Sequence, residues 1–253
     1  MKRIKNNILP ITVTILLVVL LFSGCSKNRA LRTISVESKM ERANAYYDKG
    51  KYNRAAELYL DVVFERSSKY TPIAQFRLAE SYFNQKRYSE ATFEYQEFIR
   101  LFPEHSNVNI AYFRVGESYL NISADAHYSQ KETVAALDAF DVFLDRFPFD
   151  ENKDKALKYI QEAQYKLLKK NYYNGYIYYR LYDYSAALMY FDDILSLSNR
   201  DELDKKARYY SALIYSERKD KVNAEKMLKS LKEYYPDEME TAKIEKIVSR
   251  KFR

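Results

Sequence analysis

The stretch from Leu78 to Pro103 decides how this chain folds. It reads Leu78-Ala79-x-x-Tyr82, then Tyr88-x-x-Ala91-x-x-x-Tyr95-x-x-Phe98, and it closes at Pro103. Apolar residues three and four positions apart lie on one face of a helix, so the stretch predicts two successive helices. A small residue such as Ala91 lets the helices approach closely, and the aromatic side chains fill the space between them. Pro103 ends the second helix because proline lacks an amide hydrogen and clashes with the preceding turn.

The same frame recurs along the chain. The small residue of the second helix is followed four positions later by tyrosine, phenylalanine or leucine at Ala55, Ala91, Ala136, Ala187 and Ala224. These spacings are typical of the tetratricopeptide repeat. With few glycines and prolines and no sustained alternation of apolar and polar residues, strands are not expected. We therefore predict an all-α solenoid of about five helical hairpins. The first, fourth and fifth units match the motif more weakly, and ordinary helical hairpins remain the alternative there.

Two irregularities interrupt the period. The third unit carries an insertion within residues 122–133, between its two helices. Between units three and four, residues 150–180 contain no proline and keep a helical apolar rhythm through Ala156, Ile160, Ala163 and Leu167. We interpret this segment as one long helix that ends as the first helix of unit four. Two helices with a tight break near Lys170 are the alternative.

The amino terminus has the features of an export signal. Lys2, Arg3 and Lys5 precede an apolar run from Ile8 to Phe22, which is shorter than the roughly 20 residues that span a bilayer. Residues 1–24 are therefore predicted to be a signal peptide, with an uncleaved anchor as the alternative.

The segment Leu21-Phe22-Ser23-Gly24-Cys25 resembles a bacterial lipobox. That resemblance implies cleavage before Cys25, lipid on its thiol and acylation, for example by palmitate, of the new amino group. Residues 25–34 would then be a flexible tether between the bilayer and the repeats. Ser26 is not the aspartate that holds some lipoproteins in the inner membrane. Cys25 is also the only cysteine, so it has no disulfide partner within the chain.

Charge and composition argue against several function classes. The net charge of +7 is small and dispersed, which does not favour nucleic-acid binding. The basic carboxyl-terminal end either touches lipid headgroups or complements its own helix dipole. His105 and His127 have no metal-ligand partner at helical spacing, and no glycine-rich phosphate loop occurs. We therefore expect no catalysis, no cofactor and no metal.

A more specific resemblance lies in the middle of the chain. Residues 98–106 (FIRLFPEHS) followed by residues 112–116 (YFRVG) resemble the second-to-third repeat junction of the BamD family of outer-membrane assembly lipoproteins. The insertion in unit three, residues 140–148 (FDVFLDRFP) and the long connection to Gly175 and Tyr184 resemble that family as well. Residues 149–152 and the start before Ala43 depart from its pattern.

The resemblance implies a non-catalytic lipoprotein subunit of the machinery that folds and inserts β-barrel proteins. Such a subunit is anchored in the outer membrane and faces the periplasm. Residues 150–253 would bind the barrel-forming subunit BamA, in company with other assembly lipoproteins, and residues 35–149 would receive unfolded barrel precursors. Alternative functions are assistance in pilus-secretin assembly, or an adaptor role for an envelope peptidase or cell-wall hydrolase.

Repeat geometry predicts which side chains face the groove. An aromatic groove edged by amides suits an extended peptide, and the residues expected there are Met40, Asn44, Tyr47, Phe76, Phe83, Asn84, Phe113 and Asn121. The alternative is that the phenylalanines fill the interior of the solenoid. On units four and five, exposed tyrosines often mark interfaces, and the candidates for partner binding are Tyr172, Tyr176, Tyr179 and Tyr209. Packing against neighbouring helices is the other interpretation of these tyrosines.

Overall fold

The computed structural model describes residues 35–65 and 68–253, and these residues form helices and no strand. The predicted signal peptide (1–24), Cys25 and the tether (25–34) lie outside the described residues. The helices, in order, are α2 (Val36–Asp48), α3 (Tyr52–Phe64), α4 (Thr71–Asn84), α5 (Tyr88–Leu101), α6 (Val108–Ile122), α7 (Lys131–Arg146), α8 (Lys153–Arg180), α9 (Tyr184–Ser196), α10 (Glu202–Glu217), α11 (Lys221–Tyr234) and α12 (Met239–Lys251).

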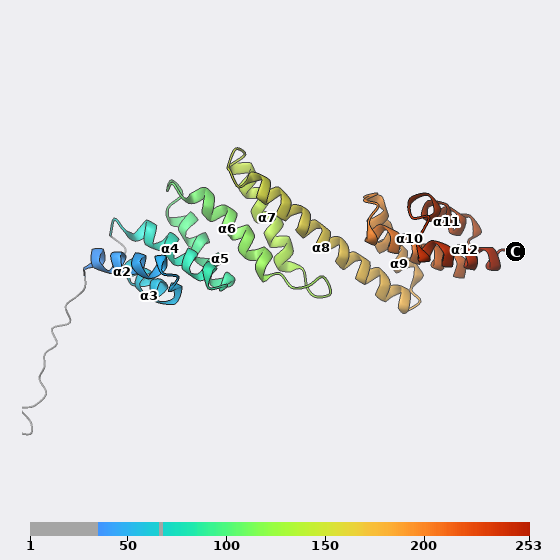
Figure 1. The fold of residues 1–253 in the computed structure, drawn as a ribbon, viewed down its shortest axis with the longest axis horizontal. Coiled ribbons are helices and arrows are strands. Elements are labelled where there is room, and N and C mark those ends of the chain that lie inside the picture. Colours follow the sequence, from blue (N-terminus) through green and yellow to red (C-terminus); the bar gives the residue numbers. More distant parts are fainter. Residues whose placement is uncertain (1–34, 66–67) are drawn as a thin grey trace, which may run out of the picture.

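The helices stack as five antiparallel hairpins, and each helix packs on the next along the chain (Figure 1). We call α2, α4, α6, α8 and α10 the first helices, and α3, α5, α7, α9 and α11 the second helices. The last helix, α12, covers α10 and α11 at the carboxyl-terminal end. The buried apolar side chains form a series of local clusters, as expected where each repeat contacts only its neighbours. The predicted all-α solenoid of tetratricopeptide type is confirmed.

The small residues found in the repeat frame lie where the paired helices are closest. The alanines at positions 55, 91, 136, 187 and 224 are completely buried. At Gly116 on α6 even a methyl group would not fit, because a Cβ there would lie 2.7 Å from ring atoms of Phe140 on α7. Gly175 on α8 has the same relation to Phe191 on α9, at 2.8 Å. Side-chain size at these positions therefore sets the spacing within a hairpin.

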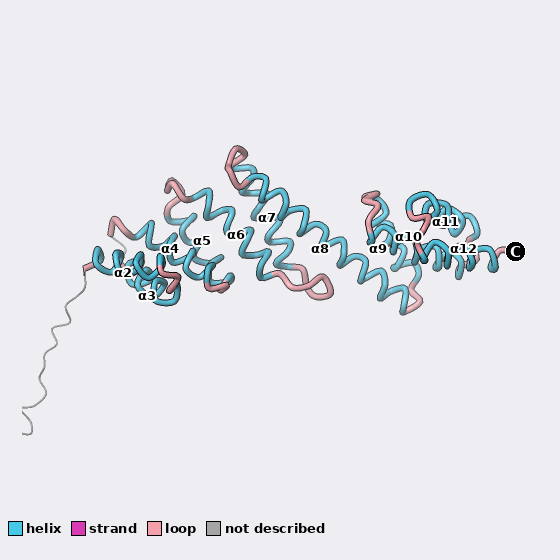
Figure 2. Tube along the Cα trace, viewed as in Figure 1, coloured by secondary structure: helices cyan, strands magenta, loops and turns pink. Residues whose placement is uncertain are grey.

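The second helices end where proline predicts. Helices α5, α7 and α11 each end two residues before a proline, at Pro103, Pro148 and Pro236. The turn inside the first hairpin contains Gly50 with φ of +69°, a conformation that glycine adopts without a steric penalty. Because successive helices are antiparallel, the loops alternate between two edges of the solenoid (Figure 2). Turns within hairpins lie at one edge and junctions between hairpins at the other.

The long helix predicted over 150–180 is present as α8, unbroken from Lys153 to Arg180. It packs on α6 and α7 of the third hairpin, on its own partner α9, and on α10 of the fifth hairpin. The insertion, between α6 and α7, lies against it. Lys166 Nζ donates to the carbonyl of Ser123 at 3.1 Å, Lys170 Nζ donates to the carbonyl of His127 at 2.9 Å, and the His127 ring stacks on Tyr173. The insertion thus braces the middle of α8.

Candidate functional site

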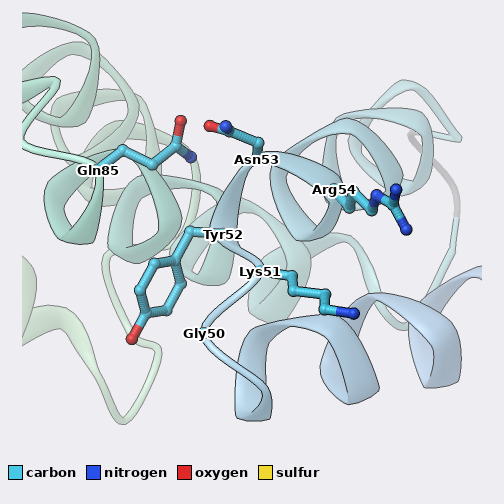
Figure 3. Close-up of a pocket in the computed structure, with 6 residues that line it drawn as sticks. All are labelled: Gly50, Lys51, Tyr52, Asn53, Arg54 and Gln85. Carbon is cyan, nitrogen blue, oxygen red and sulfur yellow. The ribbon is translucent and has the colours of Figure 1, made fainter.

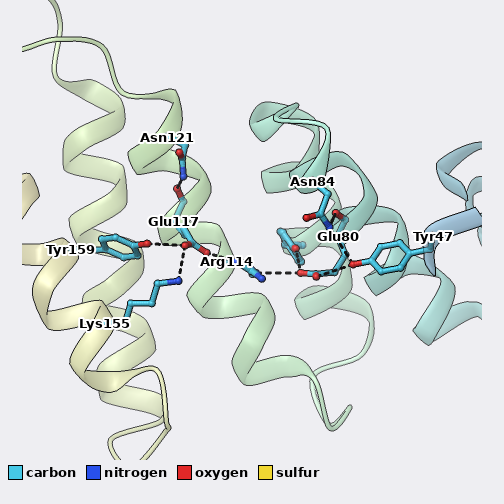
Figure 4. Close-up of polar contacts among 9 residues, drawn as sticks. Tyr47, Glu80, Asn84, Arg114, Glu117, Asn121, Lys155 and Tyr159 are labelled. Carbon is cyan, nitrogen blue, oxygen red and sulfur yellow. Dashed lines mark hydrogen bonds and ion pairs between the residues drawn. The ribbon is translucent and has the colours of Figure 1, made fainter. Parts of the chain in front are cut away.

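A chain of polar side chains runs across the first helices of the amino-terminal three hairpins and reaches α8 (Figure 4). We call it the polar network, and its members are Tyr47, Glu80, Arg114, Glu117, Lys155 and Tyr159. They come from four successive first helices, so the network joins repeats that contact only their neighbours.

Glu80 of α4 is one centre of the network. It is almost fully buried, and its carboxylate accepts hydrogen bonds from the Tyr95 hydroxyl, from the Tyr47 hydroxyl at 3.4 Å and from Arg114 Nε at 3.2 Å. A buried carboxylate is costly unless it is paired and hydrogen-bonded, and here both conditions are met. Deprotonating Tyr95 would add a second negative charge beside Glu80. Burial and that charge accordingly raise the pKa of the Tyr95 hydroxyl.

Glu117 of α6 is the second centre. It accepts from Arg114 Nη1 at 2.5 Å, from Lys155 Nζ at 2.9 Å and from the Tyr159 hydroxyl at 2.9 Å. Burial alone would raise its pKa, but the hydrogen bond from Lys155 and the charge of Arg114 outweigh burial and lower it. Glu117 is therefore an ionised carboxylate that ties α6 to α8.

The cations of the network also lie over aromatic rings. The guanidinium of Arg114 is 4.5 Å from the ring centre of Phe83, and Lys155 Nζ is 5.1 Å from that of Phe113. Such contacts stabilise a cation that is partly removed from water. Arg114 and Lys155 are both paired with carboxylates of the network, so neither of these two cations is free to grip a peptide carboxylate.

The structure places the predicted groove residues in two groups. Met40, Phe76 and Phe113 are only 6%, 5% and 2% exposed, and they pack in the interior between helices. The expectation that these three line a groove is corrected, because a first helix buries part of that face against the next hairpin. Tyr47 and Phe83 are half-buried and remain accessible at the face.

The three predicted asparagines are exposed at this face. Asn84 Nδ2 donates to the Glu80 carbonyl at 2.9 Å, and Asn121 Nδ2 donates to the Glu117 carbonyl at 2.7 Å. Asn44 Oδ1 accepts from the Tyr59 hydroxyl at 2.7 Å. These bonds fix the three amides in orientation, with part of each amide left at the surface.

The predicted partner-binding tyrosines form one aromatic cluster with Tyr210, which sequence reasoning missed. Tyr210 lies 5.2 Å from Tyr176, 5.0 Å from Tyr179 and 5.2 Å from Tyr209, measured between ring centres, and 6.3 Å from Tyr172. All five are half-buried. Burial raises the pKa values of Tyr172, Tyr179 and Tyr209, so these hydroxyls stay protonated at neutral pH. The cluster both packs α8 on α10 and leaves aromatic edges at the surface.

Comparison with known proteins gives the family. The family model YfiO, described as outer membrane lipoprotein, matches residues 35–197. The chain belongs to this family, the BamD family. A tetratricopeptide repeat model matches residues 206–238, in α10 and α11. No curated protein matches the sequence.

Solved structures share the helical-repeat arrangement at low identity. A tetratricopeptide repeat protein from Parabacteroides merdae is 17% identical, with 85% of this chain and 74% of that chain covered, at a TM-score of 0.37. The TPR2AB domain of yeast Sti1, solved in a complex described as pHSP90, is 11% identical, with 85% and 83% covered, at 0.45. Pseudomonas aeruginosa pilF is 15% identical, with 86% and 84% covered, at 0.40.

The range that matches the BamD family, residues 35–197, covers α2 to α9 and so contains the whole polar network. Within the described residues, no three histidine, cysteine, aspartate or glutamate side chains are grouped to hold a metal ion. No helix of that part of the chain is long and apolar enough to cross a membrane.

A further buried carboxylate lies beyond the family match and was also missed from the sequence. Asp204 of α10 is fully buried. It accepts from Arg208 Nε at 2.7 Å and Nη2 at 2.9 Å, and from the Tyr235 hydroxyl at 2.8 Å. Asp204 and Arg208 are four positions apart, a spacing that lets two side chains pair on one helix. Because Asp204 is buried and also accepts from Tyr235 at the end of α11, these contacts hold α10 and α11 together within the last hairpin.

Proposed function

We propose that this BamD-family lipoprotein is a non-catalytic subunit of the machinery that inserts and folds β-barrel proteins in the outer membrane. The single observation that carries the proposal is the family match over residues 35–197. A solenoid of stacked hairpins supports it, since such folds present extended surfaces for partner proteins.

The test is co-purification. The protein, tagged at its carboxyl terminus, is isolated from detergent-solubilised envelope, and its partners are identified by mass spectrometry. Recovery of the barrel-forming subunit BamA with other assembly lipoproteins is the expected result. Recovery of a pilus secretin, a peptidase or a cell-wall hydrolase in place of BamA would refute the proposal and identify the alternative function.

We further propose that the aromatic cluster of α8 and α10 contributes to the contact with the barrel-forming subunit. Half-buried tyrosines combine a large apolar ring with a polar tip, which is why they are common at interfaces. Replacing Tyr176 and Tyr179 by alanine should reduce recovery of that subunit. The matched control is Tyr128→Ala, an exposed tyrosine in the insertion. If the double variant and the control retain the partner equally, this contact lies elsewhere.

The face of the polar network is our proposed receiving surface for unfolded barrel segments. Phe83 and Tyr47 offer apolar rings, and Asn44, Asn84 and Asn121 offer amides for a peptide backbone. Truncating an interface aromatic often costs about 2 kcal/mol, which is roughly thirtyfold in affinity. Phe83→Ala should therefore weaken binding of a peptide from a barrel protein's last strand by about that factor.

The buried Phe113 provides the matched control for Phe83. Emptying a core phenylalanine costs about 3–5 kcal/mol of stability, so Phe113→Ala should lower the melting temperature strongly. Well below that temperature, the variant should bind the peptide as the parent protein does. If Phe83→Ala loses stability but keeps its peptide affinity, Phe83 is packing only and the receiving surface is refuted.

A further inference from the structure

One edge of the amino-terminal hairpins carries exposed apolar side chains. The end of every second helix meets the start of the next first helix at this edge, which Figure 2 shows as the upper row of loops in the first three hairpins. We call it the junction edge and define it by Phe64, Leu101 and Phe149. Phe64 and Leu101 are the last residues of α3 and α5, and Phe149 lies in the turn before α8. They are 72%, 47% and 98% exposed.

Two of these exposed residues belong to one hollow, and Phe149 lies at the next junction along the same edge. Phe64 and Leu101 line the same hollow between α3 and α5, together with Val63 and Phe93. Phe93 is itself 60% exposed. The hollow is mixed in character, since polar residues that include Glu94, Glu97 and Arg100 also line it. Single exposed apolar residues are ordinary in folded proteins, but a group of them indicates an interaction site.

The opposite edge of the first two hairpins is polar. The turn between α2 and α3 lines a shallow hollow with Gly50, Lys51, Asn53, Arg54 and the neighbouring Tyr52 and Gln85 (Figure 3). The corresponding turn of the second hairpin is formed by residues 85–87, a glutamine, a lysine and an arginine. The most exposed large apolar side chains of these two hairpins are Phe64, Phe93 and Leu101, and all three line the hollow between α3 and α5.

The chain enters the described structure at the junction edge. Glu37, in the first turn of α2, accepts a hydrogen bond from the Tyr70 hydroxyl at 2.5 Å and pairs with Lys69 at 3.7 Å, both at the junction between α3 and α4. Nine residues, 26–34, separate Cys25 from Ser35, so the two lie ten positions apart. At about 3.5 Å for each extended residue they are at most about 35 Å apart. A lipid on Cys25 would therefore keep the amino-terminal end of α2, where the junction edge begins, within about 35 Å of the bilayer.

We propose that the junction edge lies against the lipid surface of the outer membrane and inserts Phe64, Leu101 and Phe149 between the headgroups. The inference rests on the assignment of the chain as an outer membrane lipoprotein. Aromatic and aliphatic side chains placed at the boundary between headgroups and acyl chains add affinity in proportion to the apolar area that they bury. An acyl anchor and such an edge together hold the solenoid in one orientation.

The attraction is apolar, because the three residues that define the edge carry no charge and two cations beside them are paired. Lys69 is paired with Glu37, and Arg100 with Glu97. Membrane contact should consequently occur on uncharged phosphatidylcholine vesicles and persist at high salt. An electrostatic contact would require anionic lipid and weaken with salt.

The absence of tryptophan from the sequence makes the test direct. Phe64→Trp and Phe149→Trp each introduce one fluorescent probe at the junction edge. Tyr128→Trp, at an exposed position in the insertion on the other edge, is the matched control. Each lipoprotein is purified from membranes and reconstituted into phosphatidylcholine vesicles containing lipids with brominated acyl chains.

We expect a blue-shifted emission and quenching by the brominated chains at positions 64 and 149, and neither at position 128. Quenching unchanged in 1 M salt would support the apolar contact. Equal quenching at all three positions, or none at 64 and 149, would overturn the proposal. A blue shift that grows with protein concentration without bromine quenching would also overturn it, and would show that another protein molecule covers the edge.

A separate measurement shows whether the assignment of the chain as a lipoprotein is itself wrong. Mass spectrometry of the same preparation reports whether Cys25 carries lipid. If it carries none, the single thiol is coupled to a maleimide-bearing lipid, and the vesicle measurement decides the orientation in the same way.

Discussion

Replacing Arg114 with methionine removes the cation that two buried carboxylates share. The methionine side chain keeps an unbranched apolar stem over Phe83 while losing the hydrogen bonds to Glu80 and Glu117. The side chains of Arg114, Glu80 and Glu117 are only 27%, 12% and 8% exposed, so water replaces the lost bonds poorly.

The expected loss in the free energy of unfolding depends on which hydrogen-bond donors Glu80 and Glu117 keep. Removing one partner of a buried ion pair costs about 3–5 kcal/mol. Glu80 retains the hydroxyl of Tyr95, and Glu117 retains Lys155 and Tyr159. Because both carboxylates keep donors and Arg114 is partly exposed, we expect Arg114→Met to lower the free energy of unfolding by about 2 kcal/mol at pH 7.

The effect should depend on pH in a defined direction. The pKa of Glu117 is lowered in the folded protein, so its ionic contribution is complete above the ordinary glutamate pKa of about 4.3 and is lost as pH falls through the folded pKa. Without Arg114 the folded pKa rises towards the ordinary value, and the variant loses less stability in acid. Urea unfolding at pH 7 and at pH 4 should therefore show a smaller difference between variant and parent at pH 4.

A double-mutant cycle with Glu117→Gln checks the reasoning. The double variant should be more stable than the sum of the two single losses predicts, because the second change removes a charge that the first left without its guanidinium partner. Strict additivity, or an equal loss for Arg114→Met at both pH values, would refute the argument that Arg114 acts through these carboxylates.

Three further predictions concern other parts of the molecule. Gly116→Ala should lower the free energy of unfolding by about 1–3 kcal/mol in urea titration, since its Cβ would overlap the buried ring of Phe140. Burial raises the pKa of Glu94, although the amide of Gln75 donates a hydrogen bond that lowers it. Ionisation of Glu94 therefore reduces the stability of the fold as pH rises through that pKa. Glu94→Gln should accordingly raise the melting temperature at pH 7, and its gain should shrink below pH 4. Cys25→Ala should leave the chain uncleaved and without lipid, as read by mass and by labelling with a radioactive fatty acid; mature-sized, labelled protein would contradict this.

The sequence by itself determined the repeat frame of this protein. Small residues, aromatic residues four positions later and prolines after the second helices predicted hairpins, their order and the unbroken α8. These features follow from local rules, because helix periodicity and proline termination act within a few residues of the chain. The placement of the insertion between α6 and α7 followed from the same frame. The family resemblance also came from short local segments, chiefly residues 98–106, 112–116 and 140–148.

Only the tertiary structure decided which side chains of each first helix are surface and which are core. Met40, Phe76 and Phe113 share the predicted groove face with Phe83, yet they are buried while Phe83 is half-exposed. Periodicity cannot separate them, because a first helix packs on its own hairpin partner and on the neighbouring hairpins at once. The bonds from Arg114 to Glu80 and from Lys155 to Glu117 cross between hairpins, over more than 30 positions in the sequence. Such pairs depend on how the hairpins stack, and stacking is fixed by side-chain packing across the whole interface rather than by any local pattern.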